Sequence, residues 1–179
     1  MIIGLSGYAQ VGKDTVANYL IKEHGYRRVA FADPIREALY RLNPKVDIAD
    51  MSGVYLSAAV DGLGWENVKV DSEDTRRLLQ TMGTEVGREM FGQDFWVYQA
   101  FKGVSSEDKV VFTDVRFHNE ANHIKSYYGK MWRVNKSDHG PVNKHLSETS
   151  LDSYSFDNLI NNDGTKEDLY LAIESLLAK

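Results

Sequence analysis

The feature that most limits the folds open to this chain is a glycine-rich loop between an apolar segment and a helical one. Residues 1–6 are short and apolar, as a buried parallel strand would be, and residues 13–24 have helical periodicity that Gly25 can stop. The loop itself reads Gly7-Tyr8-Ala9-Gln10-Val11-Gly12-Lys13 and matches G-x-x-x-x-G-K. Backbone N–H groups of such a loop converge on one anion, and the helix N-terminus adds partial positive charge. Because both flanking elements are those the motif needs, a phosphate-binding loop is favoured over a plain glycine-rich turn.

The residues predicted to surround the phosphates of a nucleotide are Gly7, Gln10, Val11, Gly12, Lys13, Asp14 and Thr15. Lys13 is expected to reach the β- and γ-phosphates. Asp14 stands where a Ser or Thr hydroxyl usually ligates Mg²⁺. Two interpretations stay open: Asp14 ligates Mg²⁺ directly or through water, or Thr15 serves in its place.

Strands and helices alternate along the rest of the chain. Short apolar runs predict strands at 29–32, 110–112, 131–134 and 156–160, and helical periodicity predicts helices at 35–42, 73–91, 94–102, 117–128 and 165–177. Thr165 and Asp168 resemble a capping box at the start of the last helix. This order predicts an α/β fold, a parallel sheet covered on both faces, with ligands at the carboxyl ends of the strands. The least periodic stretch, 43–71, is expected to be an insertion or a flexible flap.

Acidic residues and arginines follow two of the predicted strands. Asp33 and Arg36 come after the second strand, and Asp114 and Arg116 come after the third. Arginine suits bidentate phosphate binding, and Asp114 could organise Mg²⁺ through water as a Walker-B-type aspartate does. Each pair alone is more typical of a solvated surface. Two such pairs in a chain with a phosphate loop favour a role in binding phosphate.

The helix predicted at 73–91 contains Gly83 and Gly87, and each interior glycine costs about 1 kcal/mol relative to alanine. That cost indicates close packing or ligand approach near Glu85 and Arg88, which an α-helix would place on one face. The alternative for this pair is a surface ion pair of little energetic weight. Just beyond this helix, Trp96 could stack on a base, although core packing is the more common role of such an aromatic residue.

Composition excludes several classes of function. The chain has no cysteine, so disulfides, thiol catalysis and cysteine-based zinc sites are excluded, and the spacing of its histidines predicts no metal cluster. A formal net charge of −5 argues against a broad surface for polymeric nucleic acid. No apolar run approaches the roughly 18 residues of a membrane-spanning helix, and the first residues lack the basic region of a signal peptide. We therefore expect a soluble cytoplasmic protein without membrane contact.

A second motif favours a different class of protein. Asn135-Lys136-Ser137-Asp138 matches the N-K-x-D sequence with which GTPases read guanine, and it follows a predicted strand. A GTPase would also carry D-x-x-G after its third strand, where this chain has Asp114-Val115-Arg116-Phe117, and a Ser or Thr after Lys13. A GTPase-like nucleotide switch is therefore the weaker alternative.

Several runs occur in an order that resembles a known family. These runs are Gly12-Lys13-Asp14-Thr15, Phe31-Ala32-Asp33-Pro34-Ile35-Arg36, Gly83-Thr84-Glu85, Asp114-Val115-Arg116-Phe117-His118-Asn119-Glu120 and His145-Leu146-Ser147-Glu148. Together they resemble the bacteriophage deoxynucleoside monophosphate kinases and, more distantly, the animal phosphomevalonate kinases. The most specific of them is the run that begins at Asp114.

The resemblance implies a three-layer P-loop kinase fold with a five-stranded parallel sheet, a lid and a monophosphate-binding insertion. The whole chain, 1–179, would be one kinase domain, with the insertion or flap at 43–71 and the lid at 135–152. The implied activity is ATP-dependent phosphorylation of a deoxynucleoside 5′-monophosphate to the diphosphate, with Mg²⁺. A kinase of another small phosphate, similar to phosphomevalonate, is the other alternative.

The resemblance also implies roles for the candidate residues. Lys13, Asp114 and Arg116 would be catalytic, and Asp14 and Asp114 would serve the metal ion. The acceptor monophosphate would contact Asp33, Arg36, Glu85, Arg88, Arg116 and Trp96. The implied partners are ATP and a deoxynucleoside monophosphate in the cytoplasm, of the host if the gene is viral, without polymeric nucleic acid. The phage kinases also raise the expectation of a homodimer.

Overall fold

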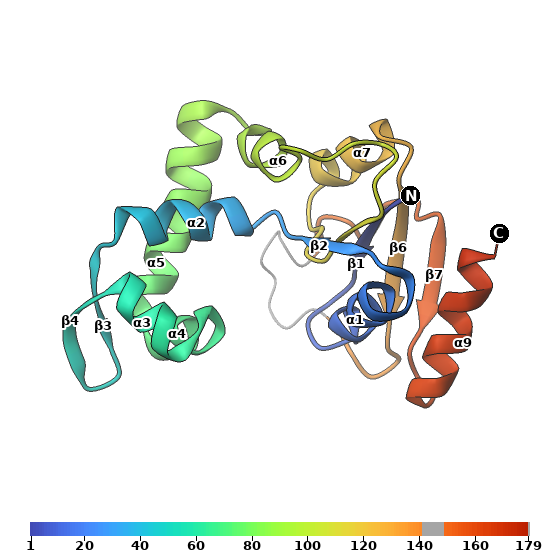
Figure 1. Cartoon of the computed structure of the whole chain (residues 1–179), viewed down its shortest axis with the longest axis horizontal. Helices are drawn as coiled ribbons and strands as arrows, with labels where there is room; N and C mark the ends of the chain where they lie inside the picture. The colour runs from blue at the N-terminus through green and yellow to red at the C-terminus, as the bar shows by residue number, and fades with distance from the viewer. Residues whose placement is uncertain (141–148, 179) are drawn as a thin grey trace. The chain divides into compact units, whose positions relative to one another are not determined.

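The apolar first residues form the middle strand of a five-stranded parallel sheet in the computed structural model, which describes residues 1–140 and 149–178 (Figure 1). The strand order is β2-β5-β1-β6-β7. The bounds are β1 (Ile2–Ser6), β2 (Arg27–Val29), β5 (Val110–Phe112), β6 (Lys130–Asn135) and β7 (Asn158–Asn161). Every neighbouring pair in this sheet is parallel, which confirms the predicted fold class.

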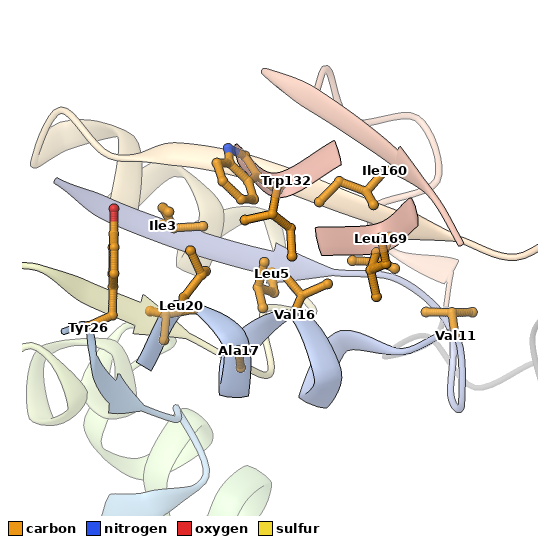
Figure 2. Packing of buried hydrophobic residues seen from close by; sticks show 13 residues of the cluster. Ile3, Leu5, Val11, Val16, Ala17, Leu20, Tyr26, Trp132, Ile160 and Leu169 are labelled. Carbon is orange, nitrogen blue, oxygen red and sulfur yellow. The ribbon is translucent and has the colours of Figure 1, made fainter. Parts of the chain in front are cut away.

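Helices cover both faces of this sheet. Alternate residues of β1 point to opposite faces, so Ile3 and Leu5 pack with Val16 and Leu20 of α1 (Lys13–His24), as Figure 2 shows. The last helix, α9 (Lys166–Leu177), adds to the same core, and its Thr165–Asp168 capping box is formed as predicted. On the other face, Gly4 leaves room for the side chains of α7 (His118–Ser126) and β6, because a Cβ there would collide with both.

The chain forms two compact units: unit 1 comprises residues 1–31 and 101–179, and unit 2 comprises 32–100. Unit 2 contains α2 (Asp33–Leu42), β3 (Lys45–Ile48), β4 (Met51–Tyr55), α3 (Leu56–Leu63), α4 (Trp65–Asp71), α5 (Glu73–Thr81), the π-helix η1 (Met82–Met90) and α6 (Phe95–Ala100). It has an apolar core of its own, made by Leu39, Val46, Ile48, Leu56, Ala59 and Val68. The segment 43–71, which lacked periodicity, forms the β3–β4 hairpin and two short helices of this unit.

Two elements differ most from their predicted form. The strand expected at 29–32 lies at Arg27–Val29 instead, and beyond it the N–H of Phe31 donates to Oδ1 of Asp114 (2.7 Å) and not to a neighbouring strand. The helix expected at 73–91 begins as α5, capped by Ser72, and continues as a π-helix from Met82. Among the described residues, no helix is long and apolar enough to cross a membrane.

Candidate phosphate-binding site

The glycine-rich loop joins β1 to α1 and depends on two glycines. Gly7 (φ 140°) and Gly12 (φ 103°) adopt conformations that L side chains rarely adopt. A Cβ at Gly7 would collide with the carbonyl oxygen of Val134 on β6, and a Cβ at Gly12 would collide with the Asn162 amide. The loop is therefore shaped by backbone conformation and by the close approach of residues at the ends of β6 and β7.

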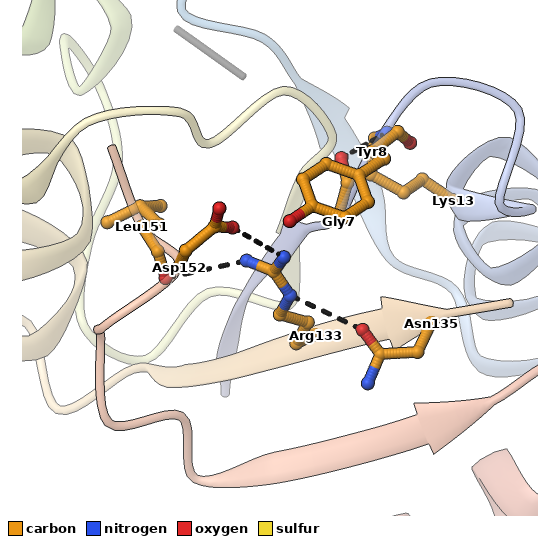
Figure 3. Close-up of polar contacts among 7 residues, drawn as sticks. All are labelled: Gly7, Tyr8, Lys13, Arg133, Asn135, Leu151 and Asp152. Atoms are coloured by element: carbon orange, nitrogen blue, oxygen red, sulfur yellow. Dashed lines mark hydrogen bonds and ion pairs between the residues drawn. The ribbon is translucent and has the colours of Figure 1, made fainter. Parts of the chain in front are cut away.

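Lys13 is the first residue of α1, and its side chain turns back over the loop. Its Nζ donates to the carbonyl oxygens of Gly7 (2.8 Å) and Tyr8 (2.6 Å), as Figure 3 shows. The ammonium group thus lies beside the backbone that the motif is expected to wrap around a phosphate. Asp14 is exposed on the first turn of α1 and Thr15 is half-buried.

Buried contacts hold the far side of the loop. Val11 is buried in the unit 1 core, and its carbonyl oxygen accepts a hydrogen bond from Nδ2 of Asn162 (2.9 Å). Gln10, next to it, is exposed with φ 63°. Sequence reasoning missed Asn162. The signal that could have found it is its place directly after β7, at the sheet edge where ligands bind.

Asp114 and Arg116 follow β5 and are fixed through their neighbours. Besides the contact of Asp114 with the Phe31 amide, the buried carboxylate of Glu120 accepts the N–H groups of Arg116 (2.7 Å) and Phe117 (3.1 Å). Arg116 is exposed, while its backbone N–H is held by the hydrogen bond to Glu120. Glu120 thus holds the backbone of Arg116, and no motif in the sequence indicates this contact.

The donor groups proposed for a metal ion are oxygens. In the described part of the chain, no group of three or more His, Asp or Glu side chains is arranged to hold a metal ion. Mg²⁺ in phosphate sites is typically held by one or two carboxylates together with phosphate oxygens and water. The chemistry of Asp14, Thr15 and Asp114 fits such a site, and their roles stay predictions.

A cavity of about 490 Å³ begins beside Thr15 at the start of α1. The loops after β6 and β7 line it through Lys136, Asn162, Asp163 and Gly164, and α9 lines it through Lys166 and Leu169. The N–H of Ser137 donates to Oδ1 of Asp163 (2.7 Å), and hydrogen bonds from Ser137 lower the pKa of Asp163. The N-K-x-D run therefore lies at a cavity next to the phosphate loop.

Arg36 lies on α2 of unit 2 and forms an ion pair that the sequence did not reveal. Its Nη2 lies 2.7 Å from Oε1 of Glu66, and its guanidinium stands 6.0 Å from the ring centroid of Trp65. Partial burial alone would raise the pKa of Glu66, but Lys69 and Arg36 outweigh it and lower this pKa. Both partners come from the segment at 43–71 that gave no periodic signal.

The remaining predicted acceptor residues also lie in unit 2. Asp33 is in the first turn of α2, while Glu85 and Arg88 are in the π-helix, where α-helical i, i+3 spacing no longer places them on one face. Trp96 is 7% exposed, and its Nε1 donates to the Gly83 carbonyl oxygen (3.0 Å). This burial favours the core-packing interpretation of Trp96 over base stacking.

Close packing is found at both glycines: a Cβ on Gly87 would collide with the indole ring of Trp96, and a Cβ on Gly83 would lie 3.3 Å from Cδ1 of Ile35. Ligand approach near Glu85 and Arg88, the other interpretation, stays a prediction. Of the lid predicted at 135–152, residues 141–148, with His145, Ser147 and Glu148, lie outside the described residues.

The family model and both of the curated relatives described below carry the same name. A family model described as deoxynucleotide monophosphate kinase matches residues 63–173, more than half of the chain. The chain is 25% identical to the deoxynucleotide monophosphate kinase of Escherichia phage RB69 over 98% of this chain and 99% of the relative. It is 29% identical to a candidate deoxynucleotide monophosphate kinase of Acanthamoeba polyphaga mimivirus over 98% of this chain and 95% of the relative. Among solved structures, shikimate kinase from Aquifex aeolicus aligns with a TM-score of 0.49 and 14% identity, covering 99% of this chain and 96% of that one.

Proposed function

Because the chain belongs to the deoxynucleotide monophosphate kinase family, we propose that it transfers the γ-phosphoryl group of ATP to a deoxynucleoside 5′-monophosphate. The observation that carries the proposal is the phosphate loop, with Lys13 curled over its carbonyl oxygens, in a chain matched by this family model. The products are ADP and the deoxynucleoside diphosphate. We expect the reaction to take place in the cytoplasm, of the host if the gene is viral.

An oxygen of the acceptor phosphate attacks the γ-phosphorus as the bond from that phosphorus to the β-phosphate oxygen breaks. The acceptor oxygen is already anionic, so no strong general base is needed. Catalysis then depends on alignment and on neutralising negative charge, which we assign to Lys13 and Arg116. Mg²⁺, when bound, supplies further neutralisation of phosphate charge, and Asp14 and Asp114 are the residues proposed to hold it, with Thr15 as the alternative to Asp14.

The two substrates are assigned to different residues. The loop from Gly7 to Thr15 is proposed to hold the phosphates of ATP, and the cavity beside Thr15 offers space for its nucleoside. Arg36 and Arg116 are proposed to grip the acceptor phosphate, with Asp33, Glu85 and Arg88 as further contacts.

The direct test is a coupled assay of ADP release with a panel of deoxyribo- and ribonucleoside monophosphates and phosphomevalonate. We expect at least one deoxynucleoside monophosphate to stimulate ADP release well above hydrolysis of ATP alone. Stimulation by none of the panel would refute the proposal. Tight binding of GTP with slow hydrolysis, and no acceptor other than water, would instead identify a nucleotide switch that uses Asn135–Asp138.

Three variants connect the assay to the proposed residues. Lys13→Ala is expected to lower kcat by about 100-fold or more, the scale of removing one preorganised stabilising donor. Arg36→Ala and Arg116→Ala should raise KM for the acceptor more than KM for ATP. Arg41→Ala is the matched control, since Arg41 is an exposed arginine of the same helix as Arg36 and pairs with Glu37 in a surface i, i+4 contact. A folded Lys13→Ala protein with near-normal turnover would show that the phosphate loop is assigned wrongly.

A further inference from the structure

Arg133 lies at the carboxyl end of β6, and the proposed reaction does not account for it. Its side chain is only 11% exposed. Polar contacts of the guanidinium join Nη2 to Oδ1 of Asp152 (2.8 Å), Nη1 to the carbonyl oxygen of Leu151 (3.4 Å) and Nε to Oδ1 of Asn135 (3.3 Å), all drawn in Figure 3. A charge so far removed from water needs such partners, so this arginine is held in one orientation.

The same guanidinium stands over the ring of Tyr8, 4.9 Å from its centroid, with Phe156 at 5.5 Å. Tyr8 is the second residue of the phosphate loop, and its carbonyl oxygen accepts from Nζ of Lys13. Arg133 therefore touches the residue whose backbone positions the proposed catalytic lysine. The register supports this contact, because Arg133 pairs with Ser6 of the neighbouring strand β1, directly before the loop.

Asp152 closes the set, which we call the Arg133 cluster: Tyr8, Arg133 and Asp152. Burial raises the pKa of Tyr8, and the neighbouring Asp152 carboxylate raises it further against the opposing effect of Arg133. The phenol thus stays protonated at neutral pH. A planar guanidinium can stack on a ring and pair with a carboxylate at once, which a lysine ammonium does less well.

We propose that Arg133 is a positioning residue for ATP: acting through the ring of Tyr8 and the carboxylate of Asp152, it holds the phosphate loop in the shape that presents Lys13 to the phosphates. This inference rests on the proposed function, since it assumes that the loop binds ATP. It assigns no contact between Arg133 and the reacting atoms. The expected signature is a loss of affinity for ATP without a change in KM for the acceptor, because none of the three residues is among those proposed to bind the acceptor.

The test measures MgATP binding by titration calorimetry without acceptor, followed by steady-state kinetics with the best monophosphate of the panel. Arg133→Ala and Tyr8→Leu should each weaken MgATP binding by about tenfold, with the acceptor KM within about twofold of the parent. Tyr8→Phe keeps the ring and should retain more affinity than Tyr8→Leu. Arg133→Lys should recover part of the loss. Arg27→Ala, which removes an exposed arginine of the same unit that lies 3.9 Å from Asp108, should bind MgATP as the parent does.

A double-mutant cycle makes the test specific. If Arg133 acts through Tyr8, the Tyr8→Leu/Arg133→Ala protein should bind MgATP no more weakly than the worse single variant. Additive losses, equal losses for both substrates, or unchanged binding in Arg133→Ala would each overturn the inference. If Arg133→Ala does not fold, Arg133→Lys and Asp152→Asn carry the same comparison, and unchanged ATP affinity in both has the same meaning. Failure of the parent protein to bind MgATP would instead refute the proposed function.

Discussion

At the scale of single residues, the backbone at Gly7 is the most demanding position in the phosphate loop. Gly7→Ala would impose a positive φ on a residue with a Cβ and drive that Cβ into the Val134 carbonyl oxygen. Gly25→Ala is the matched control, because Gly25 also has positive φ (69°) but its added Cβ would meet no described residue beyond its own chain neighbourhood within 4 Å. We expect Gly25→Ala to cost about 1–2 kcal/mol in urea unfolding, and Gly7→Ala to cost more and to weaken ATP binding. Equal effects of the two variants would contradict this account.

A second prediction at this scale concerns Glu120, whose buried carboxylate accepts the N–H groups of Arg116 and Phe117. Glu120→Ala should cost about 1–3 kcal/mol in the free energy of unfolding, because two amides lose their acceptor. Glu120→Gln, which keeps one carbonyl oxygen, should cost less. The acceptor KM should rise in step with the loss, as the Arg116 backbone is released. Chemical denaturation and steady-state kinetics of both variants measure these effects. A Glu120→Ala protein with unchanged stability and unchanged acceptor KM would show that the hydrogen bonds of Glu120 are not needed.

Residues inside a motif could be predicted from sequence, and residues that support it from a distance could not. The positions of Gly7, Gly12 and Lys13 follow from a spacing that physics ties to one loop shape. Asn162 contacts that loop from more than a hundred positions away, and its place after a predicted strand indicates the ligand-binding edge of the sheet but not this contact. The ion pair of Arg36 with Glu66 could not be predicted either, since it depends on how α2 and α4 pack.

At the scale of elements, Asp157 joins α7 to the strand pair β6–β7. Its carboxylate contacts Nζ of Lys125 (2.6 Å) and accepts the N–H of Met131 (2.7 Å). Partial burial alone would raise the pKa of Asp157, but these two hydrogen bonds outweigh it and lower this pKa. Because the folded pKa lies below the unfolded one, the stabilisation is present above the ordinary pKa of about 4 and is lost as the pH falls through the folded value.

Asp157→Asn should therefore flatten the loss of stability on acidification below about pH 4, measured as the free energy of unfolding against pH. Glu37→Gln, which removes a carboxylate from an exposed i, i+4 pair on α2, is the control and should leave the acid limb unchanged. If the free energy of unfolding of Asp157→Asn falls as steeply below about pH 4 as that of the parent, the contacts of Asp157 do not contribute to the acid sensitivity of the protein.

Elements were predictable where apolar periodicity is strong, as in α1, β5 and α9. Elements were not predictable where a side chain takes the place of a backbone hydrogen bond between strands, as the Asp114 carboxylate does just beyond β2. The π-helix at Met82–Met90 was equally hidden, because Trp96 packs against its glycines from another element and no local pattern distinguishes π from α turns.

At the scale of the whole molecule, the two units have separate apolar cores. A destabilising substitution in the core of one unit should therefore leave the stability of the other unit unchanged. Leu56, fully buried in unit 2, makes Leu56→Ala a test: we expect a loss of about 2–5 kcal/mol in that unit. Hydrogen exchange followed by mass spectrometry should accelerate across 32–100 and stay unchanged in β1 and β5. Leu42→Ala, at a position 64% exposed on α2, should change exchange in neither unit. Equal acceleration in both units would mean that the chain unfolds as one cooperative body.

The parallel sheet was predictable at this scale because alternating strands and helices admit few topologies. The segment 43–71 of unit 2 was not predictable, since its hairpin and short helices carry too few turns for a period to emerge. Its β3–β4 hairpin includes a register shift between Val46 and Ile48, which further obscures strand alternation.

The place of β1 in the sheet has a consequence for how the protein is made. β1 is translated first, yet its neighbours begin only at Val110 and Lys130. At about 5–20 residues per second, the central strand emerges on the order of 5–20 s before it can pair. Unit 2 is continuous in sequence, so it can fold during translation before the second part of unit 1, residues 101–179, has been synthesised. Unit 2 should therefore fold before β1 is incorporated into the sheet, although β1 is translated before unit 2.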